Sequence, residues 1–275
     1  MTTIALMGAG GKMGFRLSTN LQDSEFQVRH VEVSEAGRAR LKDGLGIDCM
    51  TAEEAVPGAD AVILAVPDTL IGKVSHAIEP ALAPGTLVIA LDAAAPFAGH
   101  LPEREDLHYF VAHPCHPPIF NDETTAEAQA DHFGGQHAKQ HIVSALMQGP
   151  DSAFDLGERI ARVIYAPVMR AHRVTVEQMA LLEPGLSETV AATLLAGMRE
   201  ALDDVVRRGV PQEAARDFLL GHMNIEIAVL FDEIDGVFSD AANKAIENAK
   251  SKIFQPDWLR VLEPDEIADS IRRIT

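Results

Sequence analysis

A glycine-rich turn near the beginning of the chain, between a short apolar strand and a helix, constrains the fold more than any other feature. Residues 3–7 (TIALM) have the composition of a buried strand, residues 8–14 (GAGGKMG) contain four glycines, and residues 15–21 suit a helix. This order is typical of the first unit of a dinucleotide-binding fold, where glycines permit a tight turn and a close backbone approach to a pyrophosphate. The residues expected to bind the cofactor are those of the loop: Gly8, Gly10, Gly11, Lys12, Met13 and Gly14.

The residues that follow support a nucleotide site, which matters because these glycines depart from the usual G-x-G-x-x-G spacing. Residues 27–33 are expected to form a second strand, and Glu32 stands about 20 residues beyond the loop, where an acid accepts hydrogen bonds from the ribose of NAD. A carboxylate repels the 2′-phosphate of NADP, so Glu32 favours NAD, although Arg38 and Arg40 weaken that preference. The alternative is a glycine turn in an α/β protein that binds no nucleotide.

Composition and charge narrow the possible partners. With 275 residues, 47% of them apolar, the chain is long enough for two domains or one large one. A formal net charge of −18 without a basic cluster argues against nucleic acid or an anionic membrane surface as a partner. Cys49 and Cys115 make no disulfide framework, and the early first strand leaves no room for a signal peptide. We therefore expect a soluble cytoplasmic protein that acts on a small molecule.

Three further apolar runs, at residues 60–66, 86–91 and 108–112, are expected to be parallel strands buried on both faces. Ligands of such sheets bind at the carboxyl ends of the strands. The residues that follow these strands and are expected to rim the cofactor crevice are Pro67, Asp68 and Asp92.

A change of pattern after residue 150 marks the expected domain boundary. One more strand is expected at residues 140–147, and helical periods dominate afterwards. The predicted fold class is α/β. A Rossmann-type, doubly wound and mostly parallel sheet that binds NAD is expected over residues 1–150, and an all-helical domain for substrate binding and dimerisation over residues 151–275. Its long helix is expected from about residue 175 to 208.

Glu183 is a carboxylate in the middle of the apolar stripe of this long helix. Burying an unpaired carboxylate is costly, so Glu183 requires a cation, a metal ion or protonation. Pro184 follows it and should bend or loosen the helix, which favours a functional site. The alternative is an ion pair with Arg170 or Arg173 inside the core. At ~100° per residue, the stripe consists of Met179, Glu183, Leu186, Val190, Leu194, Gly197, Ala201 and Val205.

A second group of reactive side chains follows the strand at residues 108–112. The segment His113–Pro118 (HPCHPP) holds two imidazoles on a stiff, proline-rich loop at the expected ligand edge of the sheet. Histidine is the commonest transition-metal ligand and the usual proton shuttle near neutral pH. His113 and His116 are therefore candidate catalytic or metal-binding residues, and exposed histidines on a plain turn are the alternative.

The near-continuous apolar run at residues 218–231 is too short to span a bilayer and offers more apolar surface than one small helical layer covers. We expect this surface to pack against a second copy in a homodimer. Within the run, His222 and Glu226 share one helical face. A polar pair at the subunit contact is favoured over a second catalytic pair.

Together these motifs resemble the D-apionate oxidoisomerases, over essentially the whole chain. The matching motifs are the glycine loop with Glu32, the Val66-Pro67-Asp68 turn, the HPCHPP segment with Asn121-Asp122-Glu123, and residues 182–188 (LEPGLSE). The architecture is similar, more distantly, to the 6-phosphogluconate and β-hydroxyacid dehydrogenases and to the ketol-acid reductoisomerases. The catalytic lysine motif of the β-hydroxyacid dehydrogenases is missing, because Arg170-Ala171-His172-Arg173 stands in that region.

The resemblance implies an NAD-linked oxidation of the 2-hydroxyl of a branched sugar acid, followed by migration of a hydroxymethyl group (D-apionate to 3-oxo-isoapionate), with one divalent metal ion of zinc or magnesium type. The positions that match the metal ligands of the family are His113 and Glu183. His116 is expected to remove the hydroxyl proton, with Asn121, His222 or a metal-bound hydroxide as alternatives. Two other functions stay open: a simple NAD-dependent 2- or 3-hydroxyacid dehydrogenase, and a non-catalytic NAD(H)-binding sensor.

Overall fold

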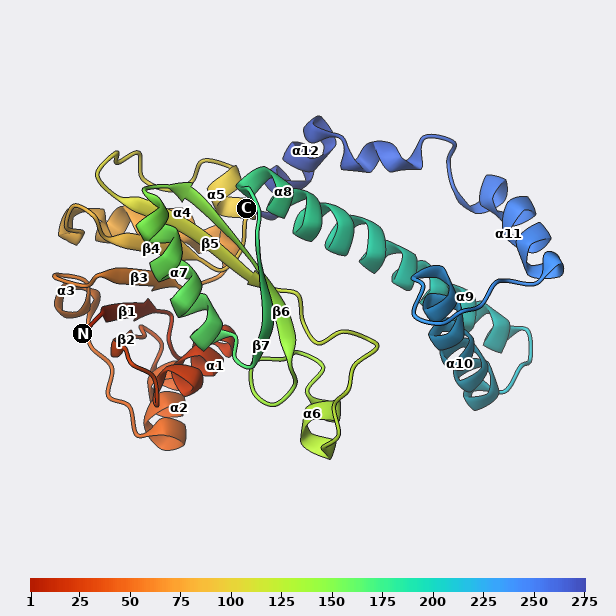
Figure 1. Ribbon diagram of the computed structural model, residues 1–275, viewed down its shortest axis with the longest axis horizontal. Helices are drawn as coiled ribbons and strands as arrows, with labels where there is room; N and C mark the ends of the chain where they lie inside the picture. Colours follow the sequence, from red (N-terminus) through yellow and green to blue (C-terminus); the bar gives the residue numbers. More distant parts are fainter. The chain divides into compact units, whose positions relative to one another are not determined.

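The computed structural model describes residues 1–275, which divide into two compact units. The first, here called the sheet unit, comprises Met1–Glu183 and Ala268–Thr275. The second, the helical unit, comprises Pro184–Ile267. The ribbon in Figure 1 follows the chain from red at the N-terminus to blue at the C-terminus.

The sheet unit is built on one seven-stranded sheet with the order β2-β1-β3-β4-β5-β6-β7. β1 to β5 are parallel, β6 runs antiparallel to β5, and β7 runs parallel to β6. Because β2 and β3 lie on opposite sides of β1, the strand order reverses there, and a ligand crevice is expected at the carboxyl end of β1. The predicted Rossmann-type, mostly parallel sheet is confirmed. The strands are β1 (Thr3–Met7), β2 (Gln27–Val31), β3 (Ala61–Leu64), β4 (Leu87–Ala90), β5 (His108–Pro114), β6 (Gln140–Gln148) and β7 (Val168–Arg173).

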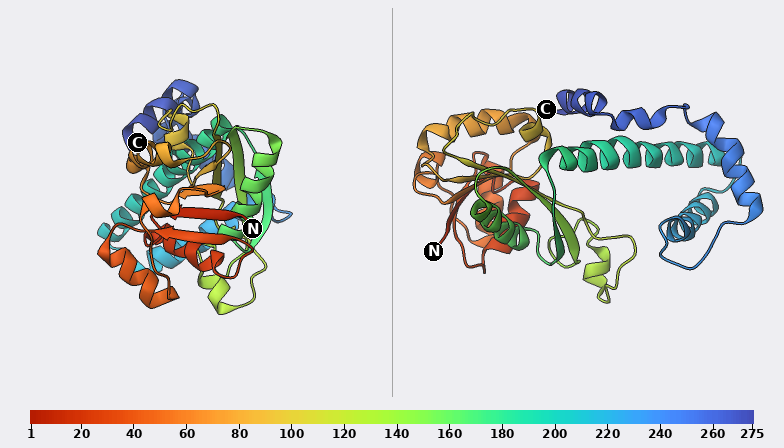
Figure 2. Two further views of the ribbon diagram at one scale, coloured as in Figure 1. Left: turned by 90° about the vertical axis from the view of Figure 1, so that its left-hand side faces the viewer. Right: turned by 45° about the horizontal axis from the view of Figure 1, so that its top comes forward.

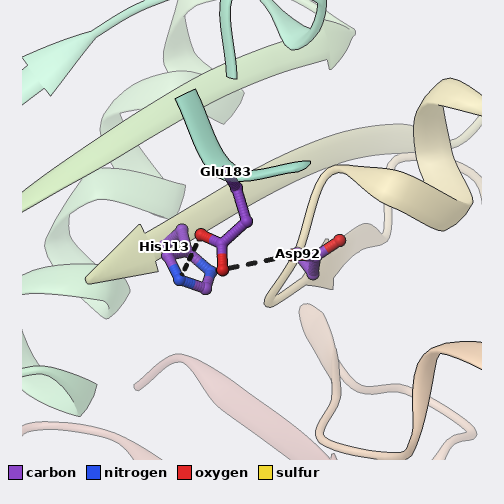
Figure 3. A group of neighbouring side chains, drawn as sticks. All are labelled: Asp92, His113 and Glu183. Atoms are coloured by element: carbon purple, nitrogen blue, oxygen red, sulfur yellow. Dashed lines mark ion pairs between the residues drawn. The ribbon is translucent and has the colours of Figure 1, made fainter. Parts of the chain in front are cut away.

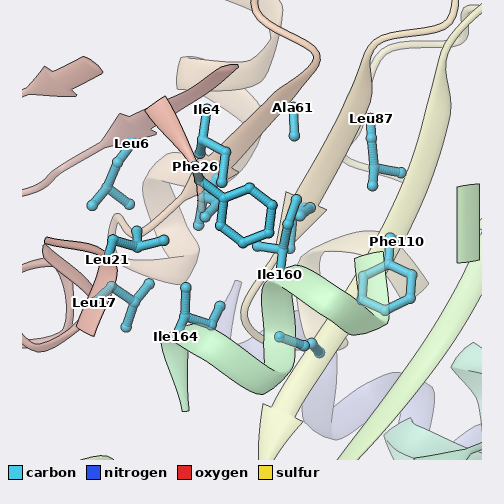
Figure 4. Close-up of a cluster of buried hydrophobic side chains, with 14 of the residues drawn as sticks. Ile4, Leu6, Leu17, Leu21, Phe26, Ala61, Leu87, Phe110, Ile160 and Ile164 are labelled. Carbon is cyan, nitrogen blue, oxygen red and sulfur yellow. The ribbon is translucent and has the colours of Figure 1, made fainter. Parts of the chain in front are cut away.

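Helices cover both faces of the sheet (Figure 2). On one face, α1, α2 and α7 enclose an apolar cluster that includes Leu17, Phe110 and Ile160 (Figure 4). On the other face, α3, α4 and α5 bury residues such as Ile71 against Val88. Burial of this apolar area is the main stabilisation of the unit. Its helices are α1 (Lys12–Leu21), α2 (Glu35–Leu45), α3 (Ala52–Ala55), α4 (Asp68–Ile78), η1 (Glu79–Ala81), α5 (Ala94–Phe97), α6 (Ala126–Ala130), α7 (Asp151–Ile164) and α8 (Val176–Ala180).

The predicted boundary at residue 150 is wrong, because the sheet continues beyond it. α7 packs on the sheet, and β7 then pairs with β6, with Ala171 opposite Ile142 and Arg173 opposite Ser144. β7 is an edge strand that carries two arginines and a histidine, so its sequence lacks the apolar run by which the inner strands were found. The helical part therefore begins at residue 184, not at 151.

The long helix predicted from residue 175 to 208 is present, but its middle is wound differently. α8 continues into η2 (Leu181–Ala192), a π-helical stretch, and then into α9 (Thr193–Arg207). Pro184 cannot donate a backbone hydrogen bond, and the Thr189 hydroxyl donates to its carbonyl. Because π-helical bonds join residues five apart, the predicted stripe is interrupted. Met179 is buried, whereas Leu186 is 51% exposed.

The helical unit contains few buried side chains. Apart from Pro184 and Gly185 at its start, only Ala228 and Ile267 are buried within it. No helix of the chain is long and apolar enough to cross a membrane. Beyond η2 and α9, the elements are α10 (Gln212–Leu230), α11 (Asp240–Ile253), η3 (Trp258–Leu262) and α12 (Pro264–Ile274), the last of which ends in the sheet unit.

Candidate functional site

The glycine loop between β1 and α1 is shaped by close backbone contacts. Gly8 has a φ of +73°, a left-handed conformation, and a Cβ there would lie 2.4 Å from the carbonyl oxygen of Ala65. At Gly14 a Cβ would lie 2.0 Å from the Gly8 carbonyl oxygen. These two glycines therefore allow the turn and the close packing of α1 on β1, as a dinucleotide loop requires.

The N-terminus of α1 is left open for an anion. Gly11 is its N-cap, no side chain caps the helix, and its first turn has no acidic residue. The first backbone N–H groups of a helix have no partner within the helix, and the helix dipole makes them attractive to phosphate. The predicted contact residues Lys12 and Met13 lie in this first turn.

Glu32 follows β2 and is fixed against the glycine loop. One of its carboxylate oxygens accepts a hydrogen bond from the Gly10 N–H at 2.9 Å, and the other accepts one from the Ser34 N–H at 2.8 Å. Arg40 donates to the Gly10 carbonyl and Arg38 to the Val33 carbonyl, both at 2.9 Å. The carboxylate thus lies beside the loop, while both arginines bind backbone carbonyls.

The other predicted crevice residues lie at the same edge of the sheet. Pro67 precedes α4, and Asp68 is the first residue of that helix, which follows the short turn at the carboxyl end of β3. Burial raises the pKa of Asp68, and the charge of Glu183 raises it further. Asp68 thus lies near enough to Glu183, a member of the acidic group described next, for the two carboxylates to repel each other.

Three side chains from three segments converge at this edge (Figure 3). His113 stands near the end of β5, Asp92 follows β4, and Glu183 lies in the first turn of η2. Their ligand atoms all lie within 4.8 Å of one another. His113 Nε2 is 2.5 Å from a Glu183 oxygen, and His113 Nδ1 is 4.0 Å from an Asp92 oxygen. All three side chains are mostly buried, with about a fifth of each exposed.

The hydrogen bonds of His113 determine what its free nitrogen can do. Nδ1 lies 2.8 Å from the Leu91 carbonyl oxygen, and since a carbonyl only accepts, Nδ1 carries the hydrogen. A neutral ring would then turn the Nε2 lone pair towards a carboxylate oxygen, so a proton or a metal ion must lie between them. Burial by itself would lower the pKa of His113. The hydrogen bond to Glu183 and its charge, together with the Leu91 carbonyl and the charge of Asp92, outweigh burial, so the pKa of His113 is raised.

This group of donors fits a divalent cation. One imidazole and two carboxylates are suitable ligands for zinc, and carboxylates also bind magnesium and calcium. A backbone carbonyl on the second imidazole nitrogen, as at His113, is the usual support of a metal-binding histidine. Burial also raises the pKa of Asp92, and the neighbouring charges of Asp68 and Glu183 raise it further. The cluster therefore has an excess of negative charge that a cation would neutralise.

His116 lies in the loop after β5 and adopts an unusual backbone conformation. Its φ is +61°, a left-handed conformation that is uncommon for a non-glycine residue, and such conformations cluster at functional sites. Its Nδ1 lies 2.8 Å from the Phe133 carbonyl oxygen, which leaves Nε2 free to accept a proton. The rings of His113 and His116 are edge to face, with centroids 6.2 Å apart.

Some sequence-based interpretations fail. The alternative that pairs Glu183 with Arg170 or Arg173 is wrong, because Glu183 pairs with His113 and Arg173 pairs with Asp151. Asp92 was expected only at the crevice rim, but it belongs to the group around His113. The signal for this was its position after β4, the strand that pairs with β5.

The predicted pair on α10 lies in the helical unit. His222 and Glu226 are both exposed in this chain. The His222 ring stacks on Phe218 at a centroid distance of 4.0 Å, and its Nδ1 lies 2.8 Å from the Phe218 carbonyl oxygen.

Comparison with known proteins covers the whole chain. The family described as "Phosphogluconate dehydrogenase (decarboxylating) C-term" matches residues 121–275, and "NADP oxidoreductase coenzyme F420-dependent" matches residues 3–95. A protein of Rhizobium rhizogenes named D-apionate oxidoisomerase is 68% identical over 275 residues, which is 100% of both chains. One of the same name from Cupriavidus necator is 67% identical over 99% of both chains.

Solved structures extend this comparison. A Cupriavidus necator protein described as a semialdehyde dehydrogenase NAD-binding protein, in complex with calcium and NAD, is 66% identical and superposes with a TM-score of 0.99 over 100% of both chains. A ketol-acid reductoisomerase from an uncultured archaeon superposes with a TM-score of 0.70 over 99% of this chain and 86% of its own, at 19% identity, which shows a shared fold.

Proposed function

Because the chain belongs to the D-apionate oxidoisomerase family, we propose that this NAD-dependent oxidoreductase oxidises the 2-hydroxyl of D-apionate and then moves a hydroxymethyl group to form 3-oxo-isoapionate. The observation that carries the proposal is the convergence of His113, Glu183 and Asp92 at the sheet edge that also holds the glycine loop and His116. An oxidation followed by a carbon shift requires an electrophilic centre, a base and a hydride acceptor at one place.

NAD is proposed to bind with its pyrophosphate at the N-terminus of α1 and its adenosine ribose at Glu32. The uncapped first turn of α1 supports the phosphate position, and the fixed carboxylate of Glu32 supports a ribose diol over a 2′-phosphate. The NAD complex of the 66% identical Cupriavidus necator protein also supports this choice of cofactor. When bound, NAD supplies the hydride acceptor.

His113 and Glu183, with Asp92 beside them, are proposed to hold one divalent cation. The calcium in the Cupriavidus necator complex shows that the related protein accepts a divalent ion. A cation held by so few protein ligands leaves positions open for substrate oxygens, and it would supply a Lewis acid that lowers the pKa of the 2-hydroxyl and polarises the ketone formed from it.

His116 is proposed to accept the proton of the 2-hydroxyl at Nε2. In the first step the C2 hydrogen leaves with its electron pair to NAD, the hydroxyl proton goes to His116, and C2 becomes a ketone. In the second step the C3 hydroxyl loses its proton and C3 becomes a ketone. The bond from C3 to a hydroxymethyl carbon breaks and forms again at C2, whose oxygen takes up a proton. The second step is redox-neutral, so one NADH forms per turnover.

The test supplies the protein with NAD, a divalent metal and either D-apionate or unbranched 2-hydroxy acids. NADH is followed by absorbance, and carbon NMR identifies the product. NADH with a rearranged carbon skeleton supports the proposal, whereas NADH with an unrearranged 2-oxo acid identifies a simple hydroxyacid dehydrogenase. No NADH with any substrate favours a non-catalytic NAD(H) sensor, although a sensor has no use for the acidic cluster around His113.

A homodimer built through the helical unit is also proposed. The helical unit leaves a large apolar surface uncovered: Phe218 is 69% exposed, Ile225 48% and Leu230 64%. Together with α9, α10 lines a groove of about 520 Å³ whose lining is mostly apolar. An exposed apolar surface on a helix pair is typical of a subunit contact, and a second copy presents the same apolar chemistry.

Light scattering at micromolar concentration tests the dimer. Ile225→Asp should give a monomer because it places a charge on the apolar surface, whereas Gln212→Asp, in the first turn of the same helix, should stay dimeric. A wild-type monomer would refute the proposed dimer.

A further inference from the structure

We propose that Phe133 is a positioning residue for His116, and that it determines which ring nitrogen of His116 carries the hydrogen. Phe133 acts from a turn at residues 131–138, here called the Asp131 turn, that connects His116 to the nucleotide-binding helix α1. The inference rests on the proposed role of His116 as the base, and it adds the element that prepares this base.

Phe133 contacts the imidazole of His116 in two ways. Its carbonyl oxygen lies 2.8 Å from His116 Nδ1, and its ring centroid lies 4.8 Å from that of His116, tilted by 61°. The carbonyl can only accept, so neutral His116 carries its hydrogen on Nδ1 and has its lone pair on Nε2. The ring contact restricts rotation of the imidazole, so that Nε2 keeps one direction.

The other contacts of the Phe133 ring are with α1. Lys12 Nζ lies 4.8 Å and the Arg16 guanidinium 4.7 Å from its centroid, both within range of a cation–π interaction. Lys12 is in the first turn of α1, which faces the expected pyrophosphate. Phe133 therefore packs between cations of the cofactor helix and the ring of the proposed base.

The Asp131 turn is held by hydrogen bonds that do not involve His116. The buried carboxylate of Asp131 accepts bonds from the backbone N–H groups of Gly134 (3.0 Å), His137 (2.9 Å) and Ala138 (3.2 Å). Arg16 donates to the Gly134 carbonyl, and Asn20 donates to the Gly135 carbonyl at 2.9 Å. These bonds fix the position of the Phe133 carbonyl relative to α1.

The strained backbone of His116 makes such support necessary. A histidine with φ at +61° relaxes unless the surrounding structure holds it, and the Asp131 turn provides contacts on both the nitrogen and the ring. Without them the ring would exchange between tautomers and rotate, and the fraction with a correctly aimed Nε2 lone pair would fall.

The first test reads the tautomer directly, without turnover. Nitrogen NMR of ¹⁵N-histidine-labelled protein distinguishes Nδ1–H from Nε2–H, and the loss of one signal set in His116→Gln assigns the resonances. We expect Nδ1–H in the wild type and in Phe133→Tyr, which keeps the ring. Phe133→Leu keeps the backbone carbonyl and should also keep Nδ1–H, losing only the contact that restricts ring rotation. A mixture of tautomers is expected in Asp131→Asn, which weakens the hydrogen bonds that hold this carbonyl in place. His132→Ala, an exposed neighbour on the same turn, is the matched control and should match the wild type.

The second test is a double-mutant cycle on turnover. Phe133→Leu should lower kcat by about 10- to 100-fold, the size expected for a misplaced catalytic group, with little change in KM or in the Kd for NAD. In the His116→Gln background the same change should have no further effect on kcat. Equal losses in both backgrounds, or Nε2–H in the wild type, would overturn the proposal. Absence of turnover on D-apionate would refute the proposed function alone, because the NMR result still decides the tautomer.

Discussion

Glu183→Gln separates the proposed cation site from a purely structural ion pair. The amide has the size of the carboxylate, and its NH₂ group can donate a hydrogen bond to His113 Nε2. The contact between residues 183 and 113, which spans 2.5 Å in the wild type, is therefore kept without a proton or metal ion between the two side chains. The fold should therefore survive. The negative charge that would bind a cation is lost.

The expected loss of affinity follows from the number of ligands. Only three side chains converge here, and Glu183 is one of two carboxylates among them. Changes in groups that merely support a ligand cost 10- to 100-fold in metal affinity. Loss of a ligand itself should cost at least ~100-fold, or about 2.7 kcal/mol.

The assay is a competition between the protein and a chromophoric chelator for a divalent metal, with thermal unfolding and NAD affinity measured on the same samples. Glu177→Gln, an exposed acid in the preceding α8, is the matched control and should leave metal affinity unchanged. The reasoning is refuted if Glu183→Gln binds metal within about threefold of the wild type, or if it keeps full activity.

Two further perturbations test other parts of the structure. Glu32→Ala should weaken NAD binding by about 10- to 150-fold, because hydrogen bonds to a charged group contribute about 1.5–3 kcal/mol, and it should relax discrimination against NADP. Glu35→Ala is the control, and tighter binding of NADP by the wild type would contradict the role of Glu32. His30→Leu tests pH-dependent stability. Burial lowers the pKa of His30 from 6.5 to about 4. Between these pH values the unfolded chain binds a proton that the folded chain does not. The free energy of unfolding therefore falls as the pH falls through this window, by up to roughly 3 kcal/mol. The buried site suits the leucine of the variant, because His30 Nε2 has no hydrogen-bond partner. In urea denaturation, the free energy of unfolding of the variant should not fall with pH between 6.5 and about 4. The same pH dependence in both proteins would show that His30 is not responsible.

The parts of the fold that sequence predicted are those set by local physics. The glycine loop is recognisable because Gly8 and Gly14 stand where any Cβ would collide with backbone. The inner strands are recognisable because burial on both faces demands continuous apolar runs, as in β3 and β4. These features require no knowledge of distant contacts.

The errors arose where a long-range contact or an irregular geometry decides the structure. β7 is defined by its pairing with β6, not by its own composition, so the boundary was placed too early. The apolar stripe of the long helix assumed uniform α-helical turns, and η2 interrupts them at Glu183. The first turn of this π-helical stretch carries Glu183, a member of the cluster, in keeping with the frequent occurrence of such turns at functional sites.

The candidate site was predictable only in part. His113 and Glu183 were paired through the resemblance to a family, because no local pattern relates residues so far apart in sequence. Asp92 was visible as an acid at a strand end, but its distance from His113 was not. The support of His116 by Phe133 depends on an irregular turn that no periodicity describes.

The most direct test of the proposed reaction uses D-apionate that carries deuterium at C2 and ¹³C at C2 and at the hydroxymethyl carbons. With NAD and a divalent metal, the account requires that the NADH formed carries one deuterium. It also requires that the product shows a one-bond ¹³C–¹³C coupling between C2 and a hydroxymethyl carbon, a bond that the substrate lacks. NADH without deuterium, or a deuterated NADH beside a product without this coupling, would contradict it.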